Sequence, residues 1–287
     1  MSESAPMRPR RSLLFVPGTR IERTAKAIAA GPDIVCIDLE DAVPPAAKAG
    51  ARDAVLAWFE EPPAFAGELL VRINAVRGVE GLRDLLAAAT SPAPPYGLLL
   101  PKVETPDEVA LVDDLLSGAG CGARLQVIIE TNRGLEACHE IGRASARLDA
   151  LLFGGIDLAA ELRVEPTWEA LLYARHRVVH AAAGAGIDLI DAPALDLDDM
   201  AGLETETARG ARIGMTGKAA IHPKQIPVIN RAFTPDAATL AYARRAVEAF
   251  ARSGTGLVVL DGKLLEAPVL RRMRRILALG GRDQAPS

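Results

Sequence analysis

Cysteine is scarce in this sequence and follows no recognisable pattern. The 287 residues contain three cysteines, Cys36, Cys121 and Cys138, with no CxxC spacing and no even set that could pair. Neither a disulfide framework nor a cysteine zinc cluster is therefore indicated. Such cysteine usage fits a reducing compartment, and we expect a cytoplasmic protein.

Long apolar runs and one-sided charge are also missing. No run approaches the roughly 20 apolar residues that a membrane-spanning helix needs. The N-terminal segment MSESAPMRPRR is polar and lacks the apolar stretch of a signal peptide. The 33 basic and 37 acidic residues are interspersed and give a net charge of −4, which provides no basic surface for nucleic acid. We therefore expect small-molecule partners, with no membrane or nucleic-acid partner.

Aromatic residues are few, whereas aliphatic residues are abundant. Only 4% of the chain is aromatic, while hydrophobic residues make up 49%. The core is therefore expected to be filled mainly by Ala, Val, Ile and Leu. The chain length is ordinary for a single α/β barrel.

Short runs rich in Val, Ile and Leu recur along the chain, each followed by a helix-like stretch. The expected strands are Ser12–Pro17, Asp33–Glu40, Leu69–Asn74, Gly97–Val103, Arg124–Glu130, Ala150–Asp157, Asp188–Ala192 and Lys218–His222. Apolar strands that alternate with amphipathic helices indicate a parallel sheet covered by helices. Eight such units close a TIM (β/α)8 barrel. An open doubly wound sheet is the rival fold, but neither a GxGxxG motif nor a Walker loop follows the first strand.

Three segments are expected along the chain. Residues 1–10 form a disordered tail, residues 11–234 form the catalytic barrel, and residues 235–287 form a C-terminal helical arm that docks on a neighbouring subunit. The last helix of the arm carries a basic run of Arg271, Arg272, Arg274 and Arg275. This run could meet the phosphates of a ligand, but a solvated helix face is the ordinary role of such a run.

The polar residues that end the strands are the candidates for a site, because active sites of these barrels lie at the C-terminal ends of the strands. These strand ends are unusually acidic. They contribute Asp38, Glu40 and Asp41 at the end of strand two, Arg72 and Asn74 in strand three, Lys102 and Glu104 at the end of strand four, Glu130 at the end of strand five and Asp157 at the end of strand six.

Glu130 and Asp157 end neighbouring strands and are expected to share a cation. Two oxygen ligands with open coordination positions suit Mg²⁺, which keeps several waters and lets substrate oxygens replace them. The Gly154–Gly155 turn leaves room for a ligand. The alternative is that each carboxylate merely caps the helix that follows it.

Arg72 lies on an apolar strand, where its permanent charge requires a carboxylate partner. That partner is either a substrate carboxylate or carbonyl group, or simply Glu40 or Asp41. Lys102 either forms a Schiff base or neutralises the acidic cluster. His222, at the end of strand eight, either reaches the site or closes the barrel.

Several segments together carry a resemblance to a known family. They are Arg11–Gly18 (RSLLFVPG), Ile37–Val43 (IDLEDAV), Val71–Ala75 (VRINA), Leu100–Lys102 (LPK), Ile129–Thr131 (IET), Gly154–Leu158 (GGIDL) and Gly217–Pro223 (GKAAIHP). In this order, over nearly the whole chain, they resemble the citrate lyase beta subunit family within the wider HpcH/HpaI aldolase superfamily.

The resemblance implies a TIM barrel with Mg²⁺ on Glu130 and Asp157. It also implies that Arg72 and Glu130 contact the keto acid that is formed or consumed. The reaction it implies is carbon–carbon bond cleavage or formation on a short coenzyme A or acyl-carrier thioester, in a homotrimer or hexamer. A separate cofactor-binding motif for the coenzyme is not readable.

Two positions depart from the family pattern. Related chains often carry Glu where this chain has Ile156, so a polar contact beside the metal is expected to be absent. Relatives tend to have Asp at the position of Glu266, supplied across a subunit boundary as an acid or base for the enolate carbon. Glu266 is the expected catalytic counterpart, with simple helix N-terminal charge as the alternative.

The expected function is that of a free-standing magnesium-dependent lyase acting on malyl-, citramalyl- or citryl-CoA. One alternative is a beta subunit of a citrate lyase complex that acts on an acyl-carrier-bound citryl thioester. The others are a non-catalytic barrel that binds a metal and a keto acid, and an aldolase that needs no thioester.

Overall fold

The computed structural model describes residues 9–253 and 257–280. Their contacts divide the chain into a barrel unit, Arg10–Asn230, and a C-terminal unit that begins at Arg231. The division falls inside helix α10, Ile226–Phe233. The expected N-terminal tail lies almost entirely outside the described residues, and docking of the C-terminal arm on another subunit stays a prediction.

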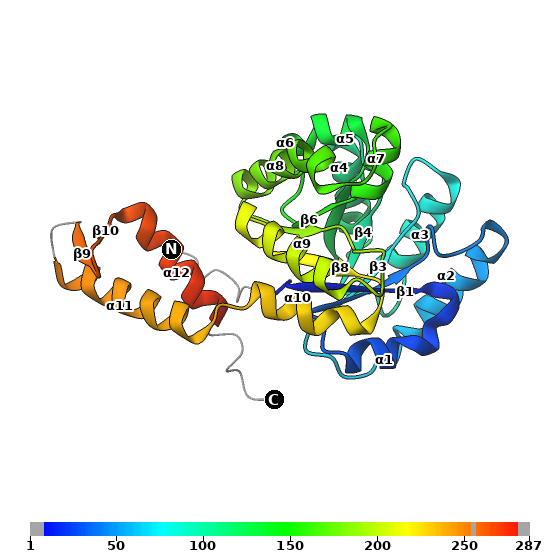
Figure 1. Cartoon of the computed structure of the whole chain (residues 1–287). Helices are drawn as coiled ribbons and strands as arrows, with labels where there is room; N and C mark the ends of the chain where they lie inside the picture. Colours follow the sequence, from blue (N-terminus) through cyan, green and yellow to red (C-terminus); the bar gives the residue numbers. More distant parts are fainter. Residues whose placement is uncertain (1–8, 254–256, 281–287) are drawn as a thin grey trace. The chain divides into compact units, whose positions relative to one another are not determined.

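Eight parallel strands close into a barrel in sequence order, which confirms the expected fold (Figure 1). They are β1 Ser12–Pro17, β2 Ile34–Asp38, β3 Glu68–Arg72, β4 Gly97–Leu100, β5 Arg124–Ile129, β6 Leu148–Phe153, β7 Asp188–Asp191 and β8 Gly217–Ala220. Leu13 of β1 pairs with Ile34 on one side and with Ala219 of β8 on the other, so the sheet has no free edge.

Aliphatic side chains fill the inside of the barrel. A buried cluster there comprises Leu13, Ile34, Cys36, Leu70, Leu99, Ile128, Ala150, Leu152, Ile190 and Ala219. The strand residues between these positions point outward and are covered by helices, as Val35 and Ile37 are. Both faces of each strand are therefore buried, which explains why the strands read as continuous apolar runs.

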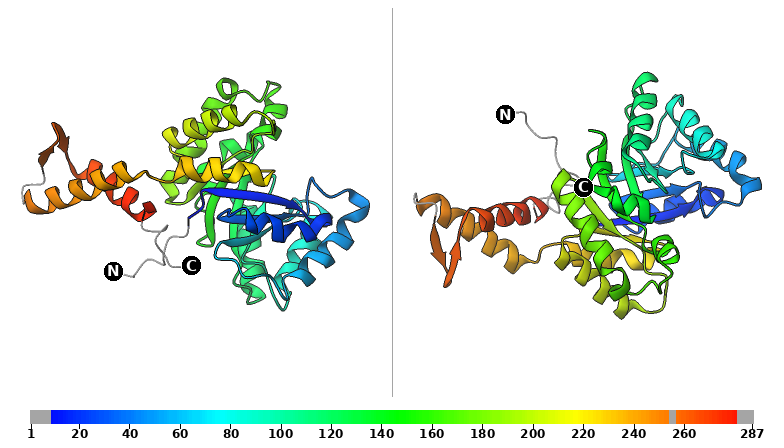
Figure 2. Two further views of the ribbon diagram at one scale, coloured as in Figure 1. Left: turned by 60° about the horizontal axis from the view of Figure 1, so that its bottom comes forward. Right: turned by 90° about the horizontal axis from the view of Figure 1, so that it is seen from above.

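Helices surround the strands on the outside of the barrel (Figure 2). They are α1 Thr24–Ala29, α2 Lys48–Trp58, α3 Val79–Ala89, α4 Pro106–Gly118, α5 Asn132–Glu136, α6 Cys138–Ile141, α7 Gly155–Leu162, α8 Trp168–Ala185 and α9 Met200–Ile213, with 3-10 turns η1 Gly18–Arg23, η2 Pro45–Ala47 and η3 Pro223–Gln225. Thr167 and Asp199 cap α8 and α9 by accepting main-chain N–H groups. Gly186 and Gly214 end the same helices in the left-handed conformation.

Most strands end earlier than the sequence pattern predicts, and strand six shows the largest difference. The expected strand Ala150–Asp157 was wrong at its end, because β6 stops at Phe153 and helix α7 begins at Gly155. Leu152 pairs with Ile190 near the end of β7, so the chain beyond Phe153 has little neighbouring strand to pair with. Asp157 therefore lies in the first turn of a helix rather than on a strand.

Beyond the end of α10, the described residues of the C-terminal unit form two helices and a hairpin. These are α11 Ala237–Ser253, the antiparallel strands β9 Val258–Leu260 and β10 Lys263–Leu265, and α12 Ala267–Gly280. Asp261 and Gly262 both have positive φ, as expected of a two-residue hairpin turn. On α12, Met273 is buried, while the four arginines of the basic run are exposed. None of the helices in the described ranges is long and apolar enough to cross a membrane.

We expect the substitution Leu99→Ala to lower the free energy of unfolding by about 2–5 kcal/mol, because it leaves a cavity in the barrel interior. Leu99 is 0% exposed, whereas Leu82 on α3 is 41% exposed and provides the control Leu82→Ala. Urea unfolding followed by circular dichroism measures both changes. Equal destabilisation by the two substitutions would contradict the packing described above.

Candidate active site

The carboxylate of Asp38 organises the loop that follows β2. Its Oδ1 accepts a hydrogen bond from the main-chain N–H of Glu40 at 2.8 Å, and its Oδ2 accepts one from Ala42 at 3.1 Å. An Asp side chain that binds main-chain N–H groups just ahead of it stabilises a turn. Asp38 thereby fixes the loop that carries Glu40 and Asp41.

The same carboxylate holds Arg72 at the end of the neighbouring strand β3. Arg72 donates from Nε to Oδ1 at 2.7 Å and from Nη2 to Oδ2 at 2.6 Å, which makes a bidentate pair. The guanidinium carbon also lies 5.0 Å from the ring centre of Phe15. Burial lowers the pKa of Arg72, but the Asp38 hydrogen bonds and nearby carboxylates outweigh it and raise the pKa overall. Arg72 is therefore a permanent cation held in one orientation.

One arm of the Arg72 fork is not hydrogen-bonded to these carboxylates. Nη1 lies 3.0 Å from Oε2 of Glu40, yet that oxygen has no hydrogen-bond partner, so the N–H groups of Nη1 are not directed at it. The carboxylate of Asp41 is farther away, at 3.7 Å. Nη1 can therefore donate to a carboxylate or carbonyl oxygen of a ligand.

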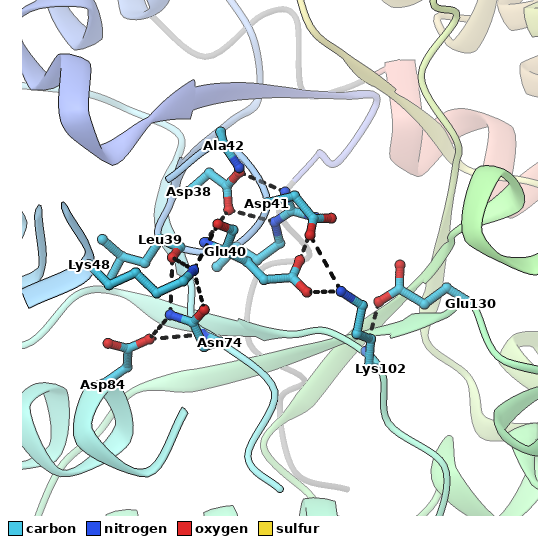
Figure 3. Close-up of polar contacts among 11 residues, drawn as sticks. Asp38, Leu39, Glu40, Asp41, Ala42, Lys48, Asn74, Asp84, Lys102 and Glu130 are labelled. Carbon is cyan, nitrogen blue, oxygen red and sulfur yellow. Dashed lines mark hydrogen bonds and ion pairs between the residues drawn. The ribbon is translucent and has the colours of Figure 1, made fainter. Parts of the chain in front are cut away.

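Glu130 follows β5 and is nearly buried, with 3% exposure. Its Oε1 accepts a hydrogen bond from the main-chain N–H of Lys102 at 2.7 Å (Figure 3). A Cβ atom at position 154 would lie 2.3 Å from the Cβ of Glu130 and 2.9 Å from its Oε2. Glycine at position 154 therefore makes room for the Glu130 side chain.

Asp157 lies close enough to Glu130 for its charge to act on the Glu130 carboxyl group. Burial raises the pKa of Glu130 to about 8, and the charges of Glu40 and Asp157 add to this effect. A cation bound next to the Glu130 carboxylate would offset the cost of ionising it in this buried position.

The Glu130 and Asp157 pair fits a magnesium ion. Carboxylate oxygens are the ligands that Mg²⁺ prefers, and it usually takes one or two of them together with water and substrate oxygens. In residues 9–253 and 257–280, no group of three or more His, Cys, Asp or Glu side chains is arranged to hold a metal. The site would therefore offer two protein ligands and leave positions open for a substrate.

Lys102 lies between the acidic loop after β2 and Glu130 (Figure 3). Its Nζ is 2.5 Å from Oε1 of Glu40 and 3.4 Å from Oδ1 of Asp41. Burial lowers the pKa of the ammonium, but the hydrogen bond with Glu40 and the surrounding carboxylates raise it overall. Lys102 therefore carries its positive charge and neutralises part of the acidic cluster, which makes it a poor Schiff-base nucleophile.

Two pockets lie along the C-terminal ends of the strands. One, of about 410 Å³, is lined by residues after β2, β3 and β4 that include Glu40, Asn74 and Lys102. The other, of about 300 Å³, is lined by residues after β6 and β7 that include Gly155 and Ile156. Ile156 is 41% exposed, so it presents an apolar surface next to Asp157.

The structure brings three of the four predicted site residues together. Arg72, Glu130 and Asp157 all belong to the barrel unit and lie at or just after the C-terminal ends of its strands. Glu266 belongs to the C-terminal unit, where it is exposed and directly precedes α12. His222 is used locally, because its Nδ1 accepts the main-chain N–H of Lys224 and caps the turn after β8. The roles assigned to the four site residues stay predictions.

Sequence reasoning missed the residues that hold the site in place. Asp38 was recognised only as one acid among several, although an Arg on the next apolar strand already called for such a partner. The hydrogen bond from the main-chain N–H of Lys102 to Glu130 could not be predicted, because almost every residue type has a main-chain N–H group.

Comparison with known proteins agrees with this picture over nearly the whole chain. The sequence profile of the family described as HpcH/HpaI aldolase/citrate lyase matches residues 11–223. Citrate lyase subunit beta of Escherichia coli (strain K12) is 34% identical over 283 residues, which cover 94% of this chain and 93% of that protein. Mitochondrial citramalyl-CoA lyase of Homo sapiens is 31% identical over 290 residues, which cover 94% of this chain and 85% of that protein.

A solved structure shows the same similarity. The protein CitE from Mycobacterium tuberculosis, in complex with magnesium, acetoacetate and coenzyme A, is 32% identical and superposes with a TM-score of 0.78. The match covers 94% of this chain and 97% of that one.

The raised pKa of Glu130 predicts a distinctive pH dependence for the metal-free protein. The folded state holds a proton on Glu130 up to a pH of about 8, whereas the unfolded state releases it near its ordinary pKa of 4.5. Stability from this group is therefore fully present below pH 4.5 and is lost as the pH rises toward 8, by at most about 1.4 kcal/mol per pH unit.

Urea unfolding in EDTA between pH 5 and 8 measures this effect, with Glu130→Gln as the variant that cannot ionise. We expect the stability of the wild type to fall more steeply with pH than that of Glu130→Gln, and Mg²⁺ to reduce the difference. Parallel curves for the two proteins in EDTA would show that the prediction is wrong.

Proposed function

Because the chain belongs to the HpcH/HpaI aldolase/citrate lyase family, we propose that it cleaves, or in reverse forms, a short 3-hydroxyacyl-CoA thioester. It is a lyase, as its named relatives are, and it uses magnesium, which the solved CitE structure contains. The finer proposal is that malyl-, citramalyl- or citryl-CoA is the substrate and that an acyl-CoA and a keto acid are the products.

The observation that carries this proposal is a guanidinium arm that makes ion pairs but no hydrogen bond with the neighbouring carboxylates, at the same end of the barrel as Glu130 and Asp157. Nη1 of Arg72 is not directed at Glu40, while Asp38 occupies the rest of the fork. Glu130 and Asp157 lie side by side at the same end of the barrel. A keto acid needs both features, because its carboxylate and its keto oxygen each carry negative charge during the reaction.

In this proposal Glu130 and Asp157 hold the magnesium ion, which would act as a Lewis acid for the oxygens of the keto acid. Arg72 donates from Nη1 to the same oxygens and is kept in place by Asp38. Cleavage begins when the 3-hydroxyl group gives its proton to a water molecule in the site. The O–H electron pair forms the keto carbonyl, and the carbon–carbon bond pair moves into the thioester as an enolate.

The enolate carbon must then take up a proton, and we assign this step to Glu266. Glu266 is exposed on the C-terminal unit, where its carboxyl group is accessible to a substrate. We propose that it acts on the site of a neighbouring subunit in a homotrimer or hexamer. Its side chain is one methylene longer than the Asp expected in relatives, so the enolate carbon that it protonates would lie at a different position from that in a relative with Asp.

A second candidate is favoured by the similarity to citrate lyase subunit beta of Escherichia coli. In that case the chain would act within a complex, on a citryl thioester carried by an acyl-carrier protein. The site would be unchanged, and only the source of the thioester would differ.

The first test is incubation of the protein and Mg²⁺ with malyl-, citramalyl-, methylmalyl- and citryl-CoA, with keto acid release followed with and without EDTA. We expect EDTA-sensitive release from at least one ester. Asp157→Ala should lower turnover by about 100-fold or more, since it removes one of two protein ligands of the metal. Turnover only of carrier-bound citrate would select the second candidate, and no release from any thioester, with the folded protein still binding a keto acid, would indicate a non-catalytic barrel.

The assignment of Glu266 is tested by Glu266→Gln and Glu266→Asp. We expect Glu266→Gln to lower kcat by about 10²–10⁴-fold, the usual contribution of a general acid or base, and Glu266→Asp to retain much more activity. The melting temperature should not change, because the side chain is exposed. Glu248 on α11 provides a control, since Glu248→Gln removes a carboxylate of the same unit without loss of activity. Full activity of Glu266→Gln would exclude the proposed role.

A further inference from the structure

Lys102 occupies a backbone conformation that disfavours its side chain. It follows β4 with φ of +54°, in the left-handed region that glycine adopts much more readily. The contact that its main chain makes, an N–H donated to Glu130 at 2.7 Å, would be available from glycine as well. A reason for lysine at this position must therefore be sought in what the ammonium group contacts.

The ammonium group shares one buried carboxylate with Arg72. Glu40 is 5% exposed, and its two oxygens face different cations. Oε1 is 2.5 Å from Nζ of Lys102, while Oε2 is 3.0 Å from Nη1 of Arg72 but makes no hydrogen bond. The directed contact of Glu40 is thus with Lys102, and its contact with Arg72 is only electrostatic.

Hydrogen bonds hold the main chain at Leu39 and Glu40 in place. A change in the contacts of Glu40 with the two cations would therefore come from rotation of its side chain. Lys48 donates to the carbonyl oxygens of Leu39 and Glu40, both at 3.0 Å. Asn74 donates to Leu39 as well and is held in turn by Asp84 (Figure 3). This network fixes the loop from the side opposite to Lys102.

Loss of the ammonium would therefore redirect Glu40. Arg72 would be the remaining cation in contact with its carboxylate among the described residues. The Glu40 side chain could then turn until Nη1 donates to it, which would occupy the arm that the proposed function assigns to the keto acid. It would also remain a repulsive charge near Glu130.

We propose that Lys102 is a positioning residue that binds Glu40 and keeps its carboxylate from accepting a hydrogen bond from Nη1 of Arg72, so that Nη1 can donate to the carboxylate of a keto acid. This inference rests on the proposed function, because it requires that Arg72 binds a keto acid. Lys102 itself need not touch the substrate.

The test measures binding of pyruvate, glyoxylate and oxaloacetate in the presence of Mg²⁺ by isothermal titration calorimetry. The proteins are the wild type, Lys102→Met, Lys102→Arg, Glu40→Gln and the double variant Lys102→Met/Glu40→Gln. We expect Lys102→Met to weaken binding of the preferred keto acid at least tenfold and Lys102→Arg to keep most of it. In the Glu40→Gln background, Lys102→Met should weaken binding of the keto acid less than threefold, because the Glu40 charge that would compete for Nη1 of Arg72 is already absent.

The dissociation constant for Mg²⁺ alone distinguishes this role from a general loss of structure. A general loss of structure would raise that constant, whereas the proposed role would not. Removal of a positive charge near the carboxylate pair should leave the Mg²⁺ dissociation constant of Lys102→Met unchanged or lower. Melting temperatures establish that each variant is folded. If Lys102→Met is unfolded, Glu40→Gln alone carries the test, and it should bind the keto acid at least as tightly as the wild type.

The outcomes separate this inference from the proposed function. If the wild type binds none of the three keto acids with Mg²⁺, the proposed function fails and the role of Lys102 fails with it. If the wild type binds one but Lys102→Met binds it equally well, only the role of Lys102 is wrong. An equal loss on Lys102→Met substitution with and without Glu40→Gln would also overturn it, because the effect would not pass through Glu40.

Discussion

The site depends on an excess of negative charge held in a small, largely buried space. Five carboxylates, those of Asp38, Glu40, Asp41, Glu130 and Asp157, gather around two cations, Arg72 and Lys102. Buried charges require partners, and among the described residues the two cations form ion pairs with Asp38, Glu40 and Asp41, at the end of β2 and in the loop after it. Neither cation forms an ion pair with Glu130 or Asp157, and a divalent cation would neutralise their negative charge.

The barrel makes this arrangement possible because it is rigid beneath the site. Closed pairing around the barrel and an aliphatic interior fix the ends of the strands relative to one another. Small main-chain details then set the positions of the carboxylates. Gly154 leaves room for Glu130, and the main-chain N–H of Lys102 orients it. The positions of the polar site residues therefore depend on the apolar packing of the barrel and on residues that do not take part in the proposed reaction.

The two units of the chain have different tasks in the proposed reaction. The barrel unit contains all the residues proposed to bind the metal and the keto acid. The C-terminal unit has a small core of its own, with Ala243, Ala246, Leu265 and Met273, and it presents Glu266. A carboxylate on a separate unit allows the acid–base step to be completed by another copy of the chain, as the proposed oligomer requires.

The sequence by itself determined the number of strands and the closed barrel, and it indicated Arg72, Glu130 and Asp157 as candidate site residues. These follow from local patterns, because apolar runs mark buried strands and the polar residues that end them meet at one end of the barrel. Only the tertiary structure decided where each strand stops, since a strand ends where its neighbour no longer pairs, and this moved Asp157 onto a helix. Only the tertiary structure also showed that Asp38 accepts two hydrogen bonds from Arg72 and that Glu40 accepts one from Lys102. These contacts join residues 34 and 62 positions apart, and they depend on how neighbouring strands align, which no local pattern records.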